Sequence, residues 1–135
     1  MRVSYTEGYF VSLPPNHPFP MGKFPVLRRI LLNEGLVTLA DIIPAEQASW
    51  ADLQLVHTPE YLRKLEHGTF DAKEIRKLGL PWSEALVFRS RVAAQGTINA
   101  AHFALEDGIA ANLGGGTHHA YPDHGEGFCV LNDVA

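Results

Sequence analysis

The sequence predicts an α/β fold in which helices cover both faces of a parallel sheet. Short apolar runs alternate with segments of helical periodicity, which is the pattern of βα units. Hydrophobic residues make up 46% of the 135 residues and charged residues 19%, which is typical of a globular chain that buries a core. We therefore expect one domain over residues 1–135, with no internal repeat.

The first third of the chain is predicted to contain a strand, a loop and a helix. Val3 and Tyr5 give residues 2–6 strand character, and four prolines between residues 14 and 20 predict a loop because proline removes backbone donors. Residues 23–34 are predicted to form a helix that ends before Gly35. Its apolar face is formed by Leu27, Ile30 and Leu31.

The central region contains a candidate strand and two predicted helices. The apolar run 53–57 has strand character, and Thr58 followed by Pro59 predicts the start of a short helix with Tyr61, Leu62 and Leu65 on its apolar face. The clearest helix covers residues 83–107, with Ser83 as its N-cap and Gly108 as its end. Residues 109–113 then predict a buried parallel strand.

The composition excludes several classes of protein. The net charge is -4, from 11 basic and 15 acidic residues, and no Lys/Arg run suggests direct binding of nucleic acid. The single cysteine, Cys129, excludes an intrachain disulfide and fits a reducing compartment. No signal peptide or long apolar run is visible, so we expect a cytoplasmic chain that does not interact with a membrane.

The stretch 114–120, GGGTHHA, is the strongest candidate for a functional site. It follows a predicted strand, and ligands of parallel sheets bind beyond the carboxyl ends of strands. His118 and His119 can exchange protons near neutral pH, which fits acid–base chemistry, but the residues alone favour a solvated loop somewhat more. A phosphate loop is disfavoured because no GxGxxG or GxxxxGK[ST] pattern occurs. A metal site is disfavoured because adjacent histidines rarely chelate one ion together and no HExxH-type spacing occurs, although ligand types are present at His118, His119, Asp123, His124 and Glu126.

The longer stretch GGGTHHAYPDHGEGFCVLNDVA resembles the histone deacetylase family. The shared motif is a glycine turn, His118-His119-Ala120, a variable loop, Gly127-Phe128-Cys129 and the pair Asn132-Asp133. The segments NHPFPMGKF, VHTPEYL and RSRVAAQGTINAAHFAL also resemble this family, so the resemblance covers nearly the whole chain.

The resemblance implies an arginase/deacetylase-like fold and a Zn²⁺-dependent hydrolysis of acetyl-lysine or a related acyl-amide. By match to the family motif, His119 would be the general base and His118 would orient the scissile group. Phe128 and Gly127 would line the tunnel that holds the acyl-lysine stem, and Gly116 would lie near the pocket floor. We read Cys129 as a packing residue, since the family uses water as the nucleophile.

The family's metal ligands, two aspartates and a histidine, follow the Gly-Phe-Cys motif in segments that lie beyond Ala135. We therefore expect the chain to be the N-terminal part of a longer catalytic domain, here truncated, and to bind no catalytic zinc by itself. The final segment, FCVLNDVA, is expected to begin a helix that has nothing to pack against. The sequence does not indicate an oligomeric state.

The substrate class is left broad by one departure from the family pattern. Many members carry an aspartate before the long helix, whereas residues 79–82 here read Gly-Leu-Pro-Trp. This leaves open acetylated lysine, fatty-acylated lysine or a small acylated amine such as an acetylated polyamine. Two alternatives remain: a non-catalytic remnant or binding module that keeps the pocket shape, and a ureohydrolase-like enzyme, whose two-manganese pattern the sequence does not match.

Overall fold

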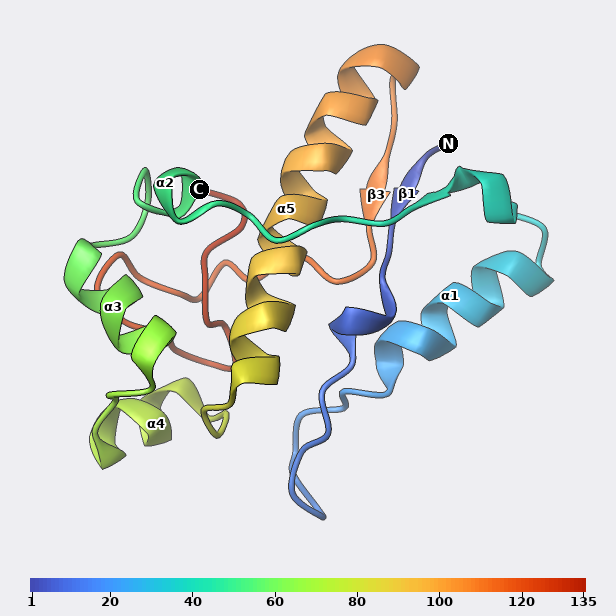
Figure 1. Cartoon of the computed structure of the whole chain (residues 1–135). Helices are drawn as coiled ribbons and strands as arrows, with labels where there is room; N and C mark the ends of the chain where they lie inside the picture. Colours follow the sequence, from blue (N-terminus) through green and yellow to red (C-terminus); the bar gives the residue numbers. More distant parts are fainter.

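The computed structural model covers residues 1–135 and contains a small parallel sheet beside one long helix (Figure 1). The strands are β1 (Val3–Ser4), β2 (Ile42–Ile43) and β3 (Ala111–Asn112), in the order β2-β1-β3. Both pairings are parallel, with Val3 opposite Ile42 on one side and Ala111 on the other. The predicted α/β class with a parallel sheet is confirmed. The strands predicted over residues 2–6 and 109–113 are present in shortened form, as β1 and β3.

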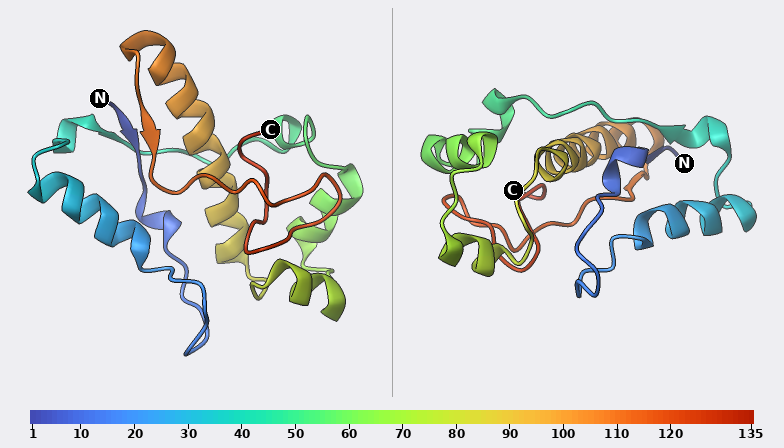
Figure 2. Two further views of the ribbon diagram at one scale, coloured as in Figure 1. Left: turned by 180° about the vertical axis from the view of Figure 1, so that it is seen from behind. Right: turned by 60° about the horizontal axis from the view of Figure 1, so that its bottom comes forward.

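The long helix α5 (Glu84–Asp107) confirms the clearest prediction from the sequence. The Ser83 side chain accepts a hydrogen bond from the backbone N–H of Leu86, and Gly108 ends the helix in the left-handed conformation at φ 82°. The helix contacts β1, β3 and α3 (Pro59–His67). Helix α1 (Lys23–Asn33) lies on the other side of β1 from α5 (Figures 1 and 2).

The remaining helices are short and form a separate group beside the first half of α5 (Figure 2). They are α2 (Trp50–Leu53), α3, which begins after its predicted cap Thr58, and α4 (Ala72–Leu78). Two 3-10 turns, η1 (Glu7–Tyr9) and η2 (Leu39–Asp41), join strands to helices. Helix α4 and strand β2 were not expected from the sequence.

The predicted strand over residues 53–57 is wrong. Ser49 caps α2 by accepting a hydrogen bond from the N–H of Asp52, and the chain continues into turns. Leu55 in those turns is 86% exposed, so the apolar run does not form a buried strand. The predicted apolar face of α1 is also wrong in part, because Leu27 and Ile30 are exposed and the buried residue of this helix is Phe24.

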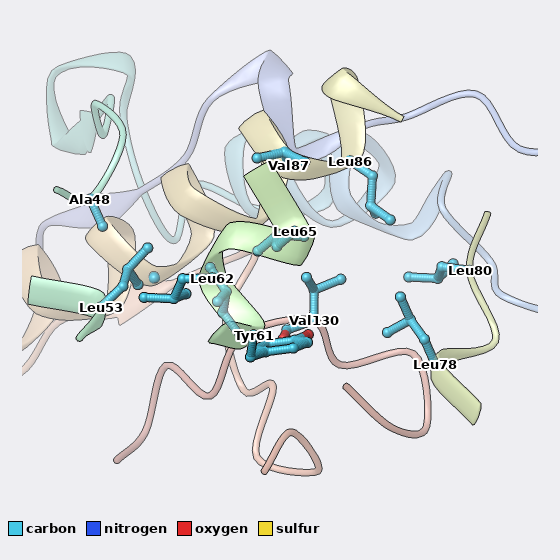
Figure 3. Packing of buried hydrophobic residues seen from close by; sticks show 12 residues of the cluster. Ala48, Leu53, Tyr61, Leu62, Leu65, Leu78, Leu80, Leu86, Val87 and Val130 are labelled. Carbon is cyan, nitrogen blue, oxygen red and sulfur yellow. The ribbon is translucent and has the colours of Figure 1, made fainter. Parts of the chain in front are cut away.

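The core consists of two clusters of buried side chains. The larger cluster joins α3, α5 and the C-terminal segment (Figure 3). Val130 and Leu131 belong to it and are almost fully buried, so the expectation that the final segment has nothing to pack against is wrong. Residues 130–135 also form no helix. The smaller cluster lies where η1 and α1 meet α5 and contains Tyr5, Tyr9, Val11, Met21, Phe24, Val92 and Ala93.

Several large apolar side chains remain exposed, the most exposed being Leu36, Leu39, Leu55, Leu105, Ile109 and Val134. The hydrophobic burial that stabilises the chain is therefore concentrated in the two clusters and in the first half of α5. None of the helices has the length and apolar character needed to cross a membrane.

Candidate active site

The chain leaves the sheet at β3 and enters the glycine turn that carries the histidine pair. Asn112 at the end of β3 anchors this exit with both ends of its amide. Its Oδ1 accepts from the Tyr9 hydroxyl at 2.8 Å and from the N–H of Gly114 at 3.0 Å. Its Nδ2 donates to the carbonyl of Ala93 at 2.8 Å and to Thr97 Oγ1 at 2.9 Å. The start of the turn is thus fixed to α5.

The three glycines of the turn are required for different reasons. A Cβ at Gly114 would stand 2.6 Å from the Tyr9 ring, and a Cβ at Gly115 would stand 2.6 Å from a carboxylate oxygen of Asp133. Gly116 has open space around it but adopts φ +88°, which side chains disfavour. The first two glycines therefore permit close packing, and the third permits the backbone to turn.

Asp133 clamps this turn from the returning arm of the chain. One carboxylate oxygen accepts from the N–H of Gly116 at 2.9 Å and from Thr97 Oγ1 at 2.6 Å. The other oxygen accepts from the N–H of Thr117 at 2.7 Å and lies 2.8 Å from its hydroxyl. Sequence reasoning placed Asp133 in the motif without a role, because its four contacts join residues far apart in the sequence.

His118 and His119 leave the clamped turn side by side. Their ring centroids are 4.2 Å apart and the rings are tilted by 40°. His118 Nδ1 lies 3.1 Å from the carbonyl of Gly116, which can only accept, so Nδ1 carries the proton. The His119 ring makes no hydrogen bond within the chain. Both rings face an open hollow of about 420 Å³, lined also by Ala120, Tyr121, Pro122, Glu126 and Asn132.

Gly127 and Phe128 return beside the histidines with unusual backbone conformations, at φ 58° and 67°. A Cβ at Gly127 would lie 3.6 Å from His119 Cβ, so the missing side chain leaves that side of His119 uncovered. The Phe128 ring points elsewhere and packs on Phe19 and His17 at centroid distances of 5.3 and 6.0 Å. The structure thus brings Gly127, but not the Phe128 ring, next to His119.

Helix α4 holds the positive φ of Phe128 in place. The N–H of Phe128 donates to the carbonyl of Leu78 at 2.8 Å, and its ring fills the space that a side chain at Gly79 would occupy. A non-glycine residue at positive φ costs about 1–2 kcal/mol and persists where surrounding contacts fix it.

Residues 79–82 have a structural role. Leu80 is fully buried, and the Trp82 indole donates to the carbonyl of Leu65 at 2.7 Å.

The structure contains no group of three or more His, Cys, Asp or Glu side chains placed to hold a metal ion. His124 is instead engaged by Asp123 at 2.6 Å and by the ammonium of Lys77 at 2.7 Å. The hydrogen bond from Lys77 lowers the pKa of Glu126, which keeps this rim carboxylate charged. The possible ligands in this loop thus pair with other side chains of the chain.

Cys129 follows Phe128 in the returning arm of the chain and is buried. Burial raises the pKa of its thiol, which disfavours the reactive thiolate. The interpretation of Cys129 as a packing residue fits this placement.

The fold and the site together define an α/β protein with a histidine pair at the carboxyl end of a parallel strand, held by an aspartate clamp. Residues 17–135 match the histone deacetylase domain model, and the chain therefore belongs to the histone deacetylase family.

The chain spans less than half the length of the relatives that it matches. An uncharacterised protein of Picosynechococcus sp. is 44% identical over 98% of this chain and 44% of its own length. Histone deacetylase 2 of Arabidopsis thaliana is 29% identical over 100% of this chain and 37% of its own. The crystal structure of an HDAC homologue complexed with SAHA superposes with a TM-score of 0.77 at 28% identity, covering 98% of this chain and 38% of that one.

Proposed function

We propose that this chain supplies the acid–base part of a zinc-dependent deacetylase site that hydrolyses acetyl-lysine or a related acyl-amide. The observation that carries the proposal is the pair His118–His119, which a clamped glycine turn presents to an open hollow at the carboxyl end of β3. Membership of the histone deacetylase family supports this chemistry. The HDAC homologue that superposes on the chain was crystallised with SAHA, and its fold supports a pocket of the same kind here.

In the proposed mechanism, His119 takes a proton from the attacking water and later returns it to the leaving amine. Its ring is suited to this role because it is exposed and makes no hydrogen bond within the chain. His118 keeps its Nδ1 proton on the carbonyl of Gly116, so its Nε2 faces outward and can orient the scissile group. The two histidines thus differ: the Nδ1 proton of His118 is held by a carbonyl of the chain, whereas neither ring nitrogen of His119 is hydrogen-bonded within the chain.

The remaining proposed site residues shape the path of the substrate. Gly127 gives the substrate room beside His119, and Gly116 exposes backbone close to the hollow. We place Phe128 in a wall of the acyl-lysine tunnel outside the histidine hollow, together with the loop that carries Phe19, against which its ring packs. Acetylated lysine and small acylated amines both remain within the proposed substrate class, and the cytoplasm is the proposed compartment.

Zinc, when bound, would polarise the acyl carbonyl and lower the pKa of water. The residues of this chain do not supply a ligand set for it. We therefore place the metal ligands in sequence outside residues 1–135. The second candidate function is a non-catalytic module that retains the pocket without hydrolysing its ligand.

A fusion of residues 1–135 to the remaining part of the Picosynechococcus relative tests the proposal. The fusion is expected to bind zinc and to release acetate from an acetyl-lysine peptide or an acetylated polyamine. A folded, zinc-loaded fusion that hydrolyses neither substrate contradicts the proposal. If the isolated 135-residue chain then still binds the peptide, the binding-module alternative is favoured.

A further inference from the structure

His57 is a buried histidine that connects both arms of the loop carrying the histidine pair. It lies in the turn before α3 and is only 2% exposed. Its Nδ1 lies 3.3 Å from the carbonyl of Pro122, on the outgoing arm. Its Nε2 lies 3.0 Å from the backbone N–H of Asn132, on the returning arm. No charged side chain hydrogen-bonds the ring.

These two partners fix the tautomer of His57. The carbonyl of Pro122 can only accept a hydrogen bond, and the N–H of Asn132 can only donate one. The ring must therefore be neutral, with its proton on Nδ1 and a free lone pair on Nε2. Burial lowers the pKa of His57, which favours the same neutral form.

Asn132 carries this connection to the histidine pair. Its Nδ2 donates to the carbonyl of Ala120 at 3.0 Å and lies 3.4 Å from the carbonyl of His118. These two carbonyls lie on either side of His119. Because His57 holds the backbone of Asn132, the position of the Asn132 amide, and through it the backbone of the pair, depends on His57.

The surroundings of His57 keep its ring in a single orientation. The ring packs on Tyr61 at a centroid distance of 5.5 Å. Tyr61 lies next to Val130 (Figure 3), and its hydroxyl donates to the carbonyl of Val130 at 2.6 Å. The N–H of Thr58, next to His57, donates to the same carbonyl of Pro122 at 2.9 Å. The start of α3 is therefore bonded to both arms of the loop at several points.

We propose that His57 is a positioning residue for the His118–His119 pair, acting as a neutral bridge between Pro122 and Asn132. Any buried histidine needs partners for its ring nitrogens, but the partners of His57 lie on opposite arms of the loop that carries the pair. The inference rests on the proposed role of the pair, but its test needs neither zinc nor turnover. The positioning role of His57 and the catalytic role of the pair can therefore fail separately.

NMR on the complete 135-residue chain tests the bridge. In the wild type, two-bond nitrogen–proton correlations are expected to place the His57 proton on Nδ1. His57→Gln keeps an acceptor near the Nε2 position, and His57→Asn keeps only a donor near the Nδ1 position. His102→Gln, on the exposed part of α5, is the matched control.

We expect the Asn132 N–H to exchange with solvent about tenfold faster or more in His57→Asn, and within about threefold of wild type in His57→Gln, since the acceptor for the Asn132 N–H is lost only in the former. The ring resonances of His118 and His119 are expected to move in His57→Asn and to stay near wild type in His57→Gln and His102→Gln. If His57→Asn does not fold, the wild-type tautomer and the His57→Gln spectrum decide.

A proton on Nε2 of His57 in the wild type overturns the proposal. Equal exchange of the Asn132 N–H in the Gln and Asn variants overturns it as well, because the acceptor would then have no effect. Unmoved His118 and His119 resonances in a folded His57→Asn chain would show that the bridge does not reach the pair.

Discussion

Replacing Asp133 by Asn removes half of the clamp on the glycine turn. The carboxylate accepts at 2.6–2.9 Å from the N–H groups of Gly116 and Thr117 and from the hydroxyl of Thr97. An Asn side chain keeps one acceptor oxygen and places an amide NH₂ where the other oxygen stood. With the NH₂ in place of the oxygen that Gly116 and Thr97 share, the N–H of Gly116 and the hydroxyl of Thr97 both lose their acceptor.

The expected loss of stability follows from these contacts. Hydrogen bonds to a charged group contribute about 1.5–3 kcal/mol each, and the partial exposure of this site places them at the lower end. Losing two of them is expected to lower the free energy of unfolding by about 3 kcal/mol. The amide resonances of Gly116 and Thr117 should shift in the same variant, because the turn loses its anchor.

Urea unfolding followed by circular dichroism measures this change. Asp107→Asn is the matched control, since the Asp107 carboxylate pairs with Arg2 on the surface, where an ion pair contributes little. A loss in Asp133→Asn no greater than in Asp107→Asn, with unchanged Gly116 and Thr117 resonances, would refute the clamp.

Three further outcomes are expected. Gly79→Ala should destabilise the chain more than Gly35→Ala, because both adopt positive φ but only a Cβ at position 79 would meet the Phe128 ring, at 2.9 Å; equal losses in urea unfolding would contradict this. The pKa of His57 lies below its ordinary 6.5, so the unfolded chain binds more protons below that pH. The melting temperature should thus decrease as the pH is lowered from about 7.5 to about 5.5, and it should decrease less in His57→Gln. Parallel curves for the two proteins would argue against the lowered pKa of His57. Cys129, whose thiol pKa is raised by burial, should react with a thiol reagent much more slowly in the folded chain than in urea, and equal rates would speak against its burial.

Local patterns predicted the elements whose boundaries depend on neighbouring residues. Ser83 and Gly108 bound α5 because capping is a short-range interaction, and Thr58 begins α3 for the same reason. Helix α4 could have been found in this way, since Asp71 and Glu74 form a capping box at its start. The prediction of a strand over residues 53–57 failed because a short apolar run has the same composition in a strand as in a turn beside a helix.

The motif named the candidate site residues, but no local pattern named the residues that support them. The motif identified His118, His119 and Gly127, and the structure brings these three together. The contacts of His57 and Asp133 join residues 16 to 75 positions apart, which no local pattern reveals. The positive φ of Phe128 was equally unpredictable, because it arises from hydrogen bonds and packing against α4.

The role of His119 as general base is the central claim, and kcat/KM for deacetylation tests it most directly. In the fusion with the remainder of the Picosynechococcus relative, His119→Ala is expected to lower kcat/KM by about 10²–10⁴-fold while the bound zinc stays unchanged. His67→Ala, on the exposed end of α3, should leave kcat/KM unaltered. Full activity of a zinc-loaded His119→Ala protein would contradict the proposed mechanism.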